Sequence, residues 1–365
     1  MGEFTYEYFK DINVDDEFFD TLKVDYPGTE HSTGFIEWFN NKAGMNEKAL
    51  VYRAESRIGA FVYLKDENEP ILLRNNSSLP KKRRVKIGTL KISELNRGQR
   101  IGEGALGLAL WYWQRLKVEE IYVTTFREHQ DIINLIERFG FSEVGENQNG
   151  EVLYLKNRND ILYSNPYESY PFLNPKFKYA GYIIFEDSYH DSMFPYSKLA
   201  KATKAMNAVE LDVANGVSKI YVSRASNVKY YVGEPVLVYR KHNGEGKRYK
   251  SCVTSICVIT NVYRVKEKGR YIIDINDLLS KIGNKSIFDQ SDLEQQYNSA
   301  YNLNVYEMLY YAYFGEGKNV NYNWLVNNGL WANNNEYPAD RKLDIDELKK
   351  IMIEGGLDVS NIIID

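Results

Sequence analysis

The sequence has few of the residues that build disulfide frameworks or metal centres. It contains 2 cysteines and 4 histidines among 365 residues, too few for a disulfide-stapled fold and poorly suited to a protein-held metal site. Its apolar runs are shorter than the roughly eighteen residues that a membrane-spanning helix needs. The first ten residues, MGEFTYEYFK, have neither the cationic start nor the apolar stretch of a secretion signal. We therefore expect a reduced, cytoplasmic protein that binds no metal and no membrane.

The overall composition is that of a soluble globular protein with two domains. Hydrophobic residues make up 44% of the chain and charged residues 26%, and this length exceeds one ordinary domain. Tyrosine is abundant, with 30 residues, and becomes denser after residue 160. A tyrosine combines an apolar ring with a polar tip, which suits surfaces that contact bases, sugars or proteins. Compositional drift in an AT-rich genome explains the abundance equally well.

Charge is distributed unevenly along the chain, although the total is only −4. Residues 1–170 carry 22 basic and 27 acidic side chains, residues 171–275 carry 17 and 9, and residues 276–365 carry 7 and 14. The middle segment therefore has a net charge of +8 between two acidic segments. Local positive charge attracts polyanions, so we expect a polyanion-binding surface there. The acidic end is expected to pack as helices or to bind a protein partner.

Residues 1–157 alternate between strand and helix patterns, which predicts an α+β domain. The predicted strands are 50–52, 58–64, 70–74, 84–92, 121–125 and 151–155, and the predicted helices are 101–116 and 129–139. Residues 158–175, with three prolines, are typical of a linker.

The second domain, residues 176–365, begins with β-rich patterns. We predict strands at 179–186, 219–224, 234–240 and 252–263, a hairpin tip at 241–250, and helices at 292–313 and 344–355. This order predicts a β-barrel over about 176–275, followed by a helical extension over 276–365. Cys252 and Cys257 fall within one strand pattern and are expected to be buried free thiols.

The most specific motif is the loop Arg97–Gly102, Arg-Gly-Gln-Arg-Ile-Gly, which joins a predicted strand directly to a predicted helix. Glycines let backbone N–H groups approach an anion closely, and the start of a helix adds the positive end of its dipole. The side chains of Arg97 and Arg100 can add positive charge. Glycine loops also precede many helices that bind nothing, so the loop alone indicates phosphate binding only weakly.

The order of strand, glycine loop, helix, strand, helix and Gly140-Phe141 resembles the GNAT superfamily of acetyl-CoA-dependent N-acetyltransferases over residues 1–157. The resemblance implies a mixed sheet flanked by helices, with acetyl-CoA as the acetyl donor. It also implies that strand 84–92 splays from strand 121–125 to receive the pantetheine arm. The cofactor-binding residues it implies are Ile92, Ser93, Arg97, Gly98, Gln99, Arg100, Ile101, Gly102 and Gly104. Two registers of the family motif fit, and both include Gln99 to Gly102.

The chain departs from the family at two positions in the second helix. His129 stands where the family commonly has Asn, and Ile136 stands where it has the Tyr that protonates the departing thiolate. Strand 84–92 also lacks a carboxylate that could act as a base. The catalytic candidates are therefore His129, whose neutral form a helix start favours, and Tyr122 and Thr124 on the strand before it. A purely structural role for His129 remains open.

The segment Val232–Arg240, Val-Gly-Glu-Pro-Val-Leu-Val-Tyr-Arg, resembles a strand of PUA-like domains, the group that includes the ASCH and EVE families. The resemblance implies a β-barrel that binds RNA or a modified base. The candidate nucleic-acid-binding residues are Lys219, Arg224, Lys229, Tyr230, Tyr231, Tyr239 and Arg240. Tyrosines in such a module can stack on unpaired bases, or they can fill the core of the barrel.

Together, the two resemblances predict an acetyl-CoA-dependent N-acetyltransferase that acts on an RNA-linked or RNA-associated amine. An aminoacyl-tRNA acceptor would imply a toxin or defence role. Two alternatives stay open. The first domain could bind acetyl-CoA without catalysis in an RNA- or modified-base-binding protein. Alternatively, the enzyme could acetylate a small amine or a protein, with a purely structural second domain. The acidic C-terminal region could support a homo-oligomer or a protein partner.

Overall fold

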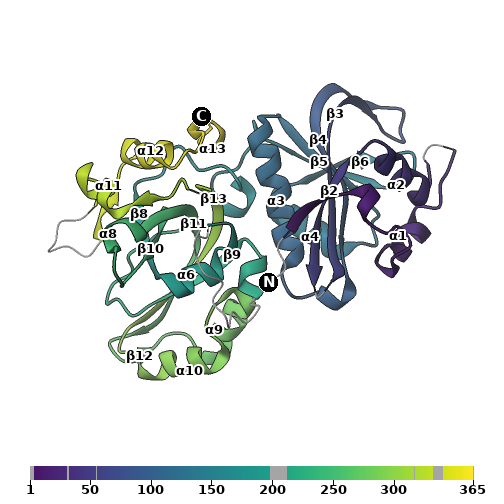
Figure 1. The fold of residues 1–365 in the computed structure, drawn as a ribbon. Coiled ribbons are helices and arrows are strands. Elements are labelled where there is room, and N and C mark those ends of the chain that lie inside the picture. Colours follow the sequence, from purple (N-terminus) through teal and green to yellow (C-terminus); the bar gives the residue numbers. More distant parts are fainter. Residues whose placement is uncertain are drawn as a thin grey trace. The chain divides into compact units, whose positions relative to one another are not determined.

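The computed structural model describes residues 4–30, 33–54, 56–197, 212–315, 317–331 and 340–364. The chain divides into two compact units, Met1–Ile161 and Leu162–Asp365 (Figure 1). The helices in the described ranges do not have the length and apolar character that crossing a membrane would require.

The first unit is built on a seven-stranded mixed sheet with the order β1-β2-β3-β4-β5-β7-β6. Its strands are β1 Phe4–Tyr8, β2 Lys48–Ala54, β3 Arg57–Leu72, β4 Ser78–Ile92, β5 Glu120–Thr125, β6 Ser142–Glu146 and β7 Val152–Asn157. β4 and β5 run parallel, and the other neighbours are antiparallel. The expected strand 70–74 is the end of β3 and its turn rather than a separate strand. The edge strands β1 and β6 were not predicted, because neither has a continuous apolar run.

Helices cover both faces of this sheet, as Figure 1 shows for α1 and α2 on one side and α3 and α4 on the other. Their bounds are α1 Asp20–Asp25, α2 Phe35–Gly44, α3 Ile101–Leu116 and α4 Gln130–Arg138. On the first face, α2 packs an aromatic cluster against β3, in which the Phe9 ring lies 4.9 Å from Phe39 and 5.5 Å from Phe61. On the other face, Ala105 of α3 packs against Leu50 and Val62. The predicted helix 101–116 is confirmed.

The second unit contains an eight-stranded mixed sheet. Its strands are β8 Ala180–Glu186, β9 Ser218–Ser223, β10 Pro235–Lys241, β11 Cys252–Glu267, β12 Arg270–Tyr271, β13 Leu303–Tyr313, β14 Val320–Asn321 and β15 Lys342–Leu343. The main path is β15-β8-β10-β11-β13-β9, with β12 and β14 both paired to β11. Among the described residues no pairing joins β15 to β9, so the closed barrel expected over 176–275 is not observed. The sheet instead recruits strands from beyond residue 300.

The helices of the second unit are short. They are α5 Pro166–Ser169, α6 Asp187–Met193, α7 Asp212–Asn215, α8 Lys247–Lys250, α9 Ile275–Ile282, α10 Gln290–Ser299, α11 Tyr322–Asn327, α12 Ile345–Glu354 and α13 Val359–Ile362. Single 3-10 turns add η1 Phe9–Asp11, η2 Glu17–Phe19 and η3 Glu94–Asn96 in the first unit, and η4 Pro195–Ser197 and η5 Gly283–Lys285 in the second.

The predicted helix 292–313 is wrong in its second half. The chain leaves α10 at Ser299, and Leu303–Tyr313 forms β13, in which ten of eleven residues are buried. A strand covered on both faces shows no alternation of polar and apolar residues, so its sequence resembles that of a buried helix. The aromatic residues of this run favour the strand.

The stretch 158–175 also differs from the linker expected there. From Leu162 onward it belongs to the second unit, and it carries the buried rings of Tyr167, Tyr170 and Phe172. The Tyr167 hydroxyl donates to Glu307 Oε1 at 3.0 Å. The segment is therefore part of the second core, and its first proline, Pro166, begins helix α5.

Candidate active site

β4 and β5 separate partway along their length. Their parallel pairing runs from Arg84 opposite Glu120 to Ile87 opposite Val123 and ends there, while β4 continues to Ile92 and β5 to Thr125. The register between β3 and β4 shifts at the same level, because Tyr63 pairs with Thr89 while Leu64 pairs with Ile87. Gly88 is therefore the extra residue of a β-bulge. A bulge bends its strand and increases the local twist, which accounts for the divergence that the family resemblance implied.

The loop after β4 turns sharply into α3. Gly98 and Arg100 both have left-handed backbone conformations, with φ of +81° and +62°, and α3 begins at Ile101. A Cβ on Gly98 would meet no atom within 4 Å, so this glycine is needed for its backbone angle and not for space. The first N–H groups of a helix have no acceptor within the helix. The start of α3 can therefore donate hydrogen bonds to an anion.

Gly102 lies between the end of β4 and α4. A Cβ built on it would stand 3.7 Å from both Ile92 Cγ1 and Leu135 Cδ2. The structure therefore brings together two of the predicted cofactor residues, Ile92 and Gly102. Ile101 and Gly104 are buried in the first turns of α3, where Ile101 packs against Tyr52 and Ala60.

Three of the predicted cofactor contacts are already engaged within the protein. Arg100 turns inward, donates to Glu103 Oε1 at 2.8 Å and exposes only 8% of its side chain, so its guanidinium does not face a ligand in the loop. The backbone N–H of Ser93 donates to the Gly59 carbonyl at 2.8 Å. The Gln99 side chain accepts a hydrogen bond from Asn96 at 3.1 Å. Arg97 is exposed, with Glu94 3.7 Å away.

On the face covered by α1 and α2, polar side chains surround the buried carboxylate of Glu151, which immediately precedes β7. Thr124 Oγ1 and the Tyr26 hydroxyl donate to Glu151 Oε1 at 3.1 and 3.0 Å, and Asn147 donates to Oε2 at 2.9 Å. Burial and the neighbouring Glu151 raise the pKa of Tyr26. Thr124 lies on β5 just past its last pair with β4, so this cluster borders the divergence.

Glu151 and Tyr26 were not predicted as site residues. They are more than a hundred positions apart in the sequence, and each resembles an ordinary loop residue. The available signal was weak: Thr124 follows the apolar run of β5, and a half-buried hydroxyl there tends to have a polar partner.

Tyr122 shares its face of β5 with Thr124 but acts as a structural donor. Its hydroxyl donates to Glu67 Oε1, and burial, followed by this hydrogen bond, raises its pKa. Burial alone would raise the pKa of Glu67, but hydrogen bonds from Lys65 and Tyr122 outweigh it and lower the pKa. With a raised pKa and a hydroxyl that already donates to Glu67, Tyr122 is a weaker proton donor than an ordinary tyrosine, and its catalytic role stays a prediction.

His129 is separated from the other two catalytic candidates. It is half-buried before α4, with Nδ1 3.3 Å from Thr125 Oγ1. Successive residues of a strand point to opposite faces, so Thr125 faces away from Thr124 and Tyr122. The three catalytic candidates, His129, Tyr122 and Thr124, therefore do not lie in one cluster. Ile136 is fully buried.

Most of the predicted nucleic-acid residues serve the interior of the second unit. The buried ones are Lys219, Tyr230, Tyr239 and Arg240. Lys219 donates to the Val213 carbonyl, and Tyr230 donates to the Tyr182 carbonyl at 2.7 Å. These four side chains pack inside a sheet that is covered on both faces. They are therefore part of the packing of the unit and do not form an exposed binding surface.

The remaining three candidates differ in their surroundings. The Tyr231 hydroxyl donates to the Tyr179 carbonyl at 3.0 Å, and Lys229 pairs with Asp340 at 2.5 Å. Arg224 is exposed. The seven residues therefore do not form the single surface that the sequence suggested.

Arg240 belongs to a closed polar network that was not predicted. It donates through Nε and one terminal nitrogen to Asp191, both at 2.8 Å. Asp191 lies 2.8 Å from His190 Nδ1, and His190 Nε2 lies 2.8 Å from Thr254 Oγ1. Burial would raise the pKa of Asp191, but the hydrogen bonds from Arg240 and His190 outweigh it and lower the pKa to about 2. His190 and Thr254 are completely buried, so this network is structural.

Among the described residues, neither the two cysteines nor the other possible metal ligands form a metal centre. Cys252 and Cys257 are free and buried, as predicted, and burial raises the pKa of Cys252 to about 12. Within the described ranges, no three His, Cys, Asp or Glu residues are grouped in a way that would hold a metal ion.

Comparison with known proteins finds likeness only in structure. The chain matches no protein-family model and no curated protein. An N-acetyltransferase from Staphylococcus aureus Mu50 is 12% identical with a TM-score of 0.31, over 43% of this chain and 98% of that one. NAA60 from Arabidopsis thaliana, solved with acetyl-CoA, is 17% identical with a TM-score of 0.30, over 43% and 99%. The ribosomal-protein-S18-alanine N-acetyltransferase from Escherichia coli is 12% identical with a TM-score of 0.29, over 42% and 91%.

These matches cover less than half of the chain, a share close to that of the first unit, which holds 161 of the 365 residues. At such low identities and TM-scores we draw no argument about function from them. They do not identify the second unit. The functional assignment therefore rests on the geometry of the chain itself.

Proposed function

We propose that the first unit is an acetyl-CoA-dependent N-acetyltransferase. The observation that carries the proposal is the divergence of β4 and β5 beyond Ile87 and Val123, which lies next to the loop Arg97–Gly102. Backbone groups on separated strands can hold an extended amide chain such as pantetheine, because they no longer bond to each other. The loop and the start of α3 can hold the phosphates.

The reaction needs a proton acceptor beside the thioester. The amine nitrogen attacks the thioester carbonyl carbon, the carbon–sulfur bond breaks, and the thiolate of coenzyme A leaves. The proton lost by the amine then needs a base. We assign this role to Glu151, because Tyr26, Thr124 and Asn147 hold its carboxylate at the border of the divergence. A thiolate is a stable enough leaving group to depart without an acid, which is consistent with Ile136.

A transfer assay tests the proposal. Purified protein is incubated with radiolabelled acetyl-CoA and a cell lysate, and the RNA, protein and small-molecule fractions are counted separately. We expect label in at least one fraction. Gly102→Glu should abolish both transfer and acetyl-CoA binding, because it puts bulk and negative charge between Ile92 and Leu135. Gly44→Glu, at an exposed end of α2 with no atom within 4 Å of the new Cβ, is the matched control.

The same assay separates the alternatives. Wild-type protein that binds acetyl-CoA but labels no fraction would contradict the enzyme and favour a non-catalytic acetyl-CoA-binding unit. Label confined to small molecules would favour a small-amine acetyltransferase.

For the acceptor, we propose an amine that is part of RNA or bound to it. The support is the charge of +8 carried by residues 171–275 and the exposed Arg224. Label in the RNA fraction that is lost on ribonuclease treatment is the expected result. Label that stays with protein after that treatment would contradict the RNA-linked acceptor while leaving the acetyltransferase intact.

A further inference from the structure

We infer that single-stranded nucleic acid docks on an exposed turn of the second unit, at the junction of β11 and β12. The turn surface consists of Arg224, Arg264, Lys268, Arg270 and Tyr301. The inference rests on the proposed function in one respect, that the acceptor amine is part of RNA or bound to it. Binding of nucleic acid at this surface is measured without acetyl-CoA.

The turn is held in one conformation by its backbone. Glu267 pairs with Arg270 across a two-residue turn, Lys268 and Gly269, whose φ angles are both positive at +48° and +80°. This is the tight hairpin geometry that matches the twist of its strands. The Gly269 N–H donates to the Tyr301 carbonyl at 2.7 Å, and the Lys268 N–H donates to Asn302 Oδ1 at 2.8 Å. The turn is thus tied to the segment that leads into β13.

Tyr301 provides an exposed aromatic ring at this turn. Its side lies against Gly269, where a Cβ would stand 3.7 Å from Tyr301 Cε2, and the residue is 66% exposed. Among the described residues no other ring packs on it. Next to it, Tyr271 is stacked on Tyr297 at 4.7 Å with Lys266 Nζ 4.2 Å from its centroid. Tyr271 therefore supports the turn, while Tyr301 remains available for stacking.

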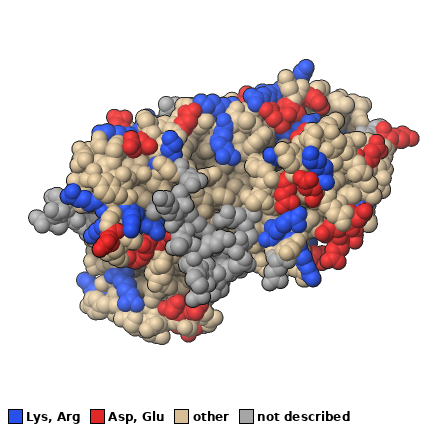
Figure 2. All heavy atoms as spheres, in the orientation of Figure 1, with Lys and Arg blue, Asp and Glu red and all other residues tan. Residues whose placement is uncertain are grey.

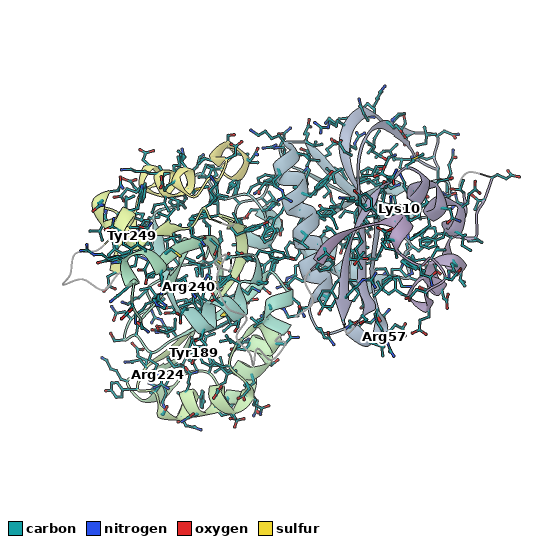
Figure 3. All side chains as sticks on the ribbon, in the orientation of Figure 1. Lys10, Arg57, Tyr189, Arg224, Arg240 and Tyr249 are labelled. Carbon is teal, nitrogen blue, oxygen red and sulfur yellow. The ribbon has the colours of Figure 1, made fainter. Side chains whose placement is uncertain are left out.

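Four cations lie on the turn and on the strands beside it, and they carry positive charge. Arg224, Arg264, Lys268 and Arg270 are all exposed, and in the described part of the chain none of them forms an ion pair. Arg224 reaches the Ser299 hydroxyl at 3.4 Å, which places it beside the end of α10. Figure 2 shows Lys and Arg side chains at the lower left of the second unit, the corner where Figure 1 places β12 and Figure 3 labels Arg224.

Several exposed arginines of the first unit are paired with neighbouring carboxylates. In the first unit, Arg74 pairs with Glu146 at 2.5 Å, Arg83 with Asp66 at 2.6 Å, and Arg127 with Glu143 at 2.7 Å. The turn surface is different because Glu267 is the only acidic residue in the run Tyr263–Tyr271. Cations without protein partners attract phosphates and gain free energy by releasing counterions.

The combination of one exposed ring with flanking cations favours single strands. Unpaired bases can stack on a tyrosine while guanidinium and ammonium groups follow the phosphates. A duplex keeps its bases stacked on one another, so it would use the cations and leave Tyr301 without a role.

Fluorescence anisotropy with a labelled twelve-nucleotide oligouridine tests the inference. The triple variant Arg264→Gln, Lys268→Gln, Arg270→Gln should weaken binding at least about tenfold and reduce the slope of log K against log salt by about 2. Tyr301→Ser should weaken binding roughly fivefold to a hundredfold. Oligodeoxyuridine of the same length serves to compare RNA with DNA.

Matched controls are available at α8, near the other end of β11, where Figure 3 labels Tyr249. Lys247→Gln, Arg248→Gln, Lys250→Gln removes the same charge from exposed positions, and Tyr249→Ser removes an exposed ring that is 68% exposed. Because α8 also has exposed cations beside an exposed ring, it is a stringent control: docking confined to the turn surface predicts changes below about twofold from both. Equal losses from the two triple variants, a neutral Tyr301→Ser, tighter binding of a duplex, or no binding by wild type would each overturn the inference.

The two proposals fail separately. Wild-type protein that transfers acetyl groups but does not bind the oligonucleotides would overturn the docking surface alone. Protein that binds them through Tyr301 but transfers no acetyl group would overturn the acetyltransferase alone.

Discussion

Among the described residues, each unit has one parallel pair of strands inside a mixed sheet, and the two pairs differ. In the first unit, β4 and β5 pair over four residues from Arg84 to Ile87 and then separate. In the second unit, β8 and β10 stay paired over six residues, from Val236 opposite Gly181 to Lys241 opposite Glu186. The first pair is interrupted next to the Gly88 bulge in β4. β10 also has a register shift, where Val238 and Tyr239 pair with β11, but its pairing with β8 continues past that point.

The polar groups beside the two pairs differ in the same way. Next to β10, the carboxylate of Asp191 is held by both nitrogens of a bidentate Arg240 and by His190, which leaves this network complete without a ligand. Next to β5, the donors to the carboxylate of Glu151 in the described part of the chain are the neutral side chains of Tyr26, Thr124 and Asn147. A carboxylate with neutral donors can still take up a proton or bind an ammonium group. A pair of strands whose hydrogen bonding stops beside a carboxylate with neutral donors is therefore a better sign of an active site than buried polar residues alone.

The largest expected effect comes from replacing Glu151. Glu151→Gln removes the proposed base and should reduce the rate of acetyl transfer roughly 10²- to 10⁴-fold, the range typical of general-base catalysis. Because Glu151 does not lie in the loop proposed to hold the cofactor, the Kd for acetyl-CoA should stay within about threefold. Steady-state rates and isothermal titration calorimetry check the two parts.

Asp191→Asn provides the comparison variant in the second unit. It disturbs a half-buried carboxylate that is also held by hydrogen bonds, so it should lower stability without changing the rate of transfer by folded protein. A transfer rate that falls as far for Asp191→Asn as for Glu151→Gln would show that the carboxylate of Glu151 has no special part in the reaction.

The Asp191 network also predicts a pH effect on stability. The pKa of the Asp191 carboxyl is lowered to about 2 in the folded protein, from an ordinary value of 3.8. The group therefore stabilises the fold above about pH 4, and this contribution is lost as the pH falls through about 2. The difference corresponds to about 2 kcal/mol in the free energy of unfolding.

Urea unfolding of wild type and Asp191→Asn between pH 5 and pH 2.5 measures this contribution. The wild type should lose more stability than the variant, by up to about 2 kcal/mol. Parallel losses in both proteins would mean that Asp191 is not stabilised as an anion in the folded state.

The elements that were predicted correctly have strong local signals. The helix Ile101–Leu116 follows a glycine loop and has a continuous apolar face, and β8, β10 and β11 are apolar runs bounded by polar or glycine-containing turns. Such patterns follow from contacts within one element. The sharp turn in the loop Arg97–Gly102 could be expected for the same reason, because its glycines permit the positive backbone angles observed there.

The elements and residues that were missed depend on distant contacts. β13 was predicted as helix because both of its faces are covered by other parts of the unit, which removes the alternation of a strand. Glu151 was missed because its donors Tyr26 and Thr124 come from other segments. Tyr230 and Tyr239 were assigned to a surface because sequence alone does not show how many layers cover a strand.

The smallest expected effect concerns the bulge that separates the two strands. A Cβ on Gly88 would stand 2.9 Å from Tyr63 Cδ1, and the Tyr63 ring is held between Phe9 and Trp38, at 5.3 and 5.6 Å. Since this ring has little room to move, Gly88→Ala should shift β4 and alter its divergence from β5. We expect acetyl-CoA binding to weaken about tenfold, an effect of about 1.4 kcal/mol.

A matched substitution in the same unit distinguishes this effect from general strain. Gly145→Ala places a Cβ 3.1 Å from Leu73 Cδ1 at the register shift between β6 and β7, away from the paired end of β4 and β5. It should lower the melting temperature while leaving the Kd for acetyl-CoA unchanged. If both alanine variants weakened binding equally, the bulge at Gly88 would have no special part in opening the sheet. If only Gly88→Ala did so, the interrupted ladder would be tied directly to the cofactor.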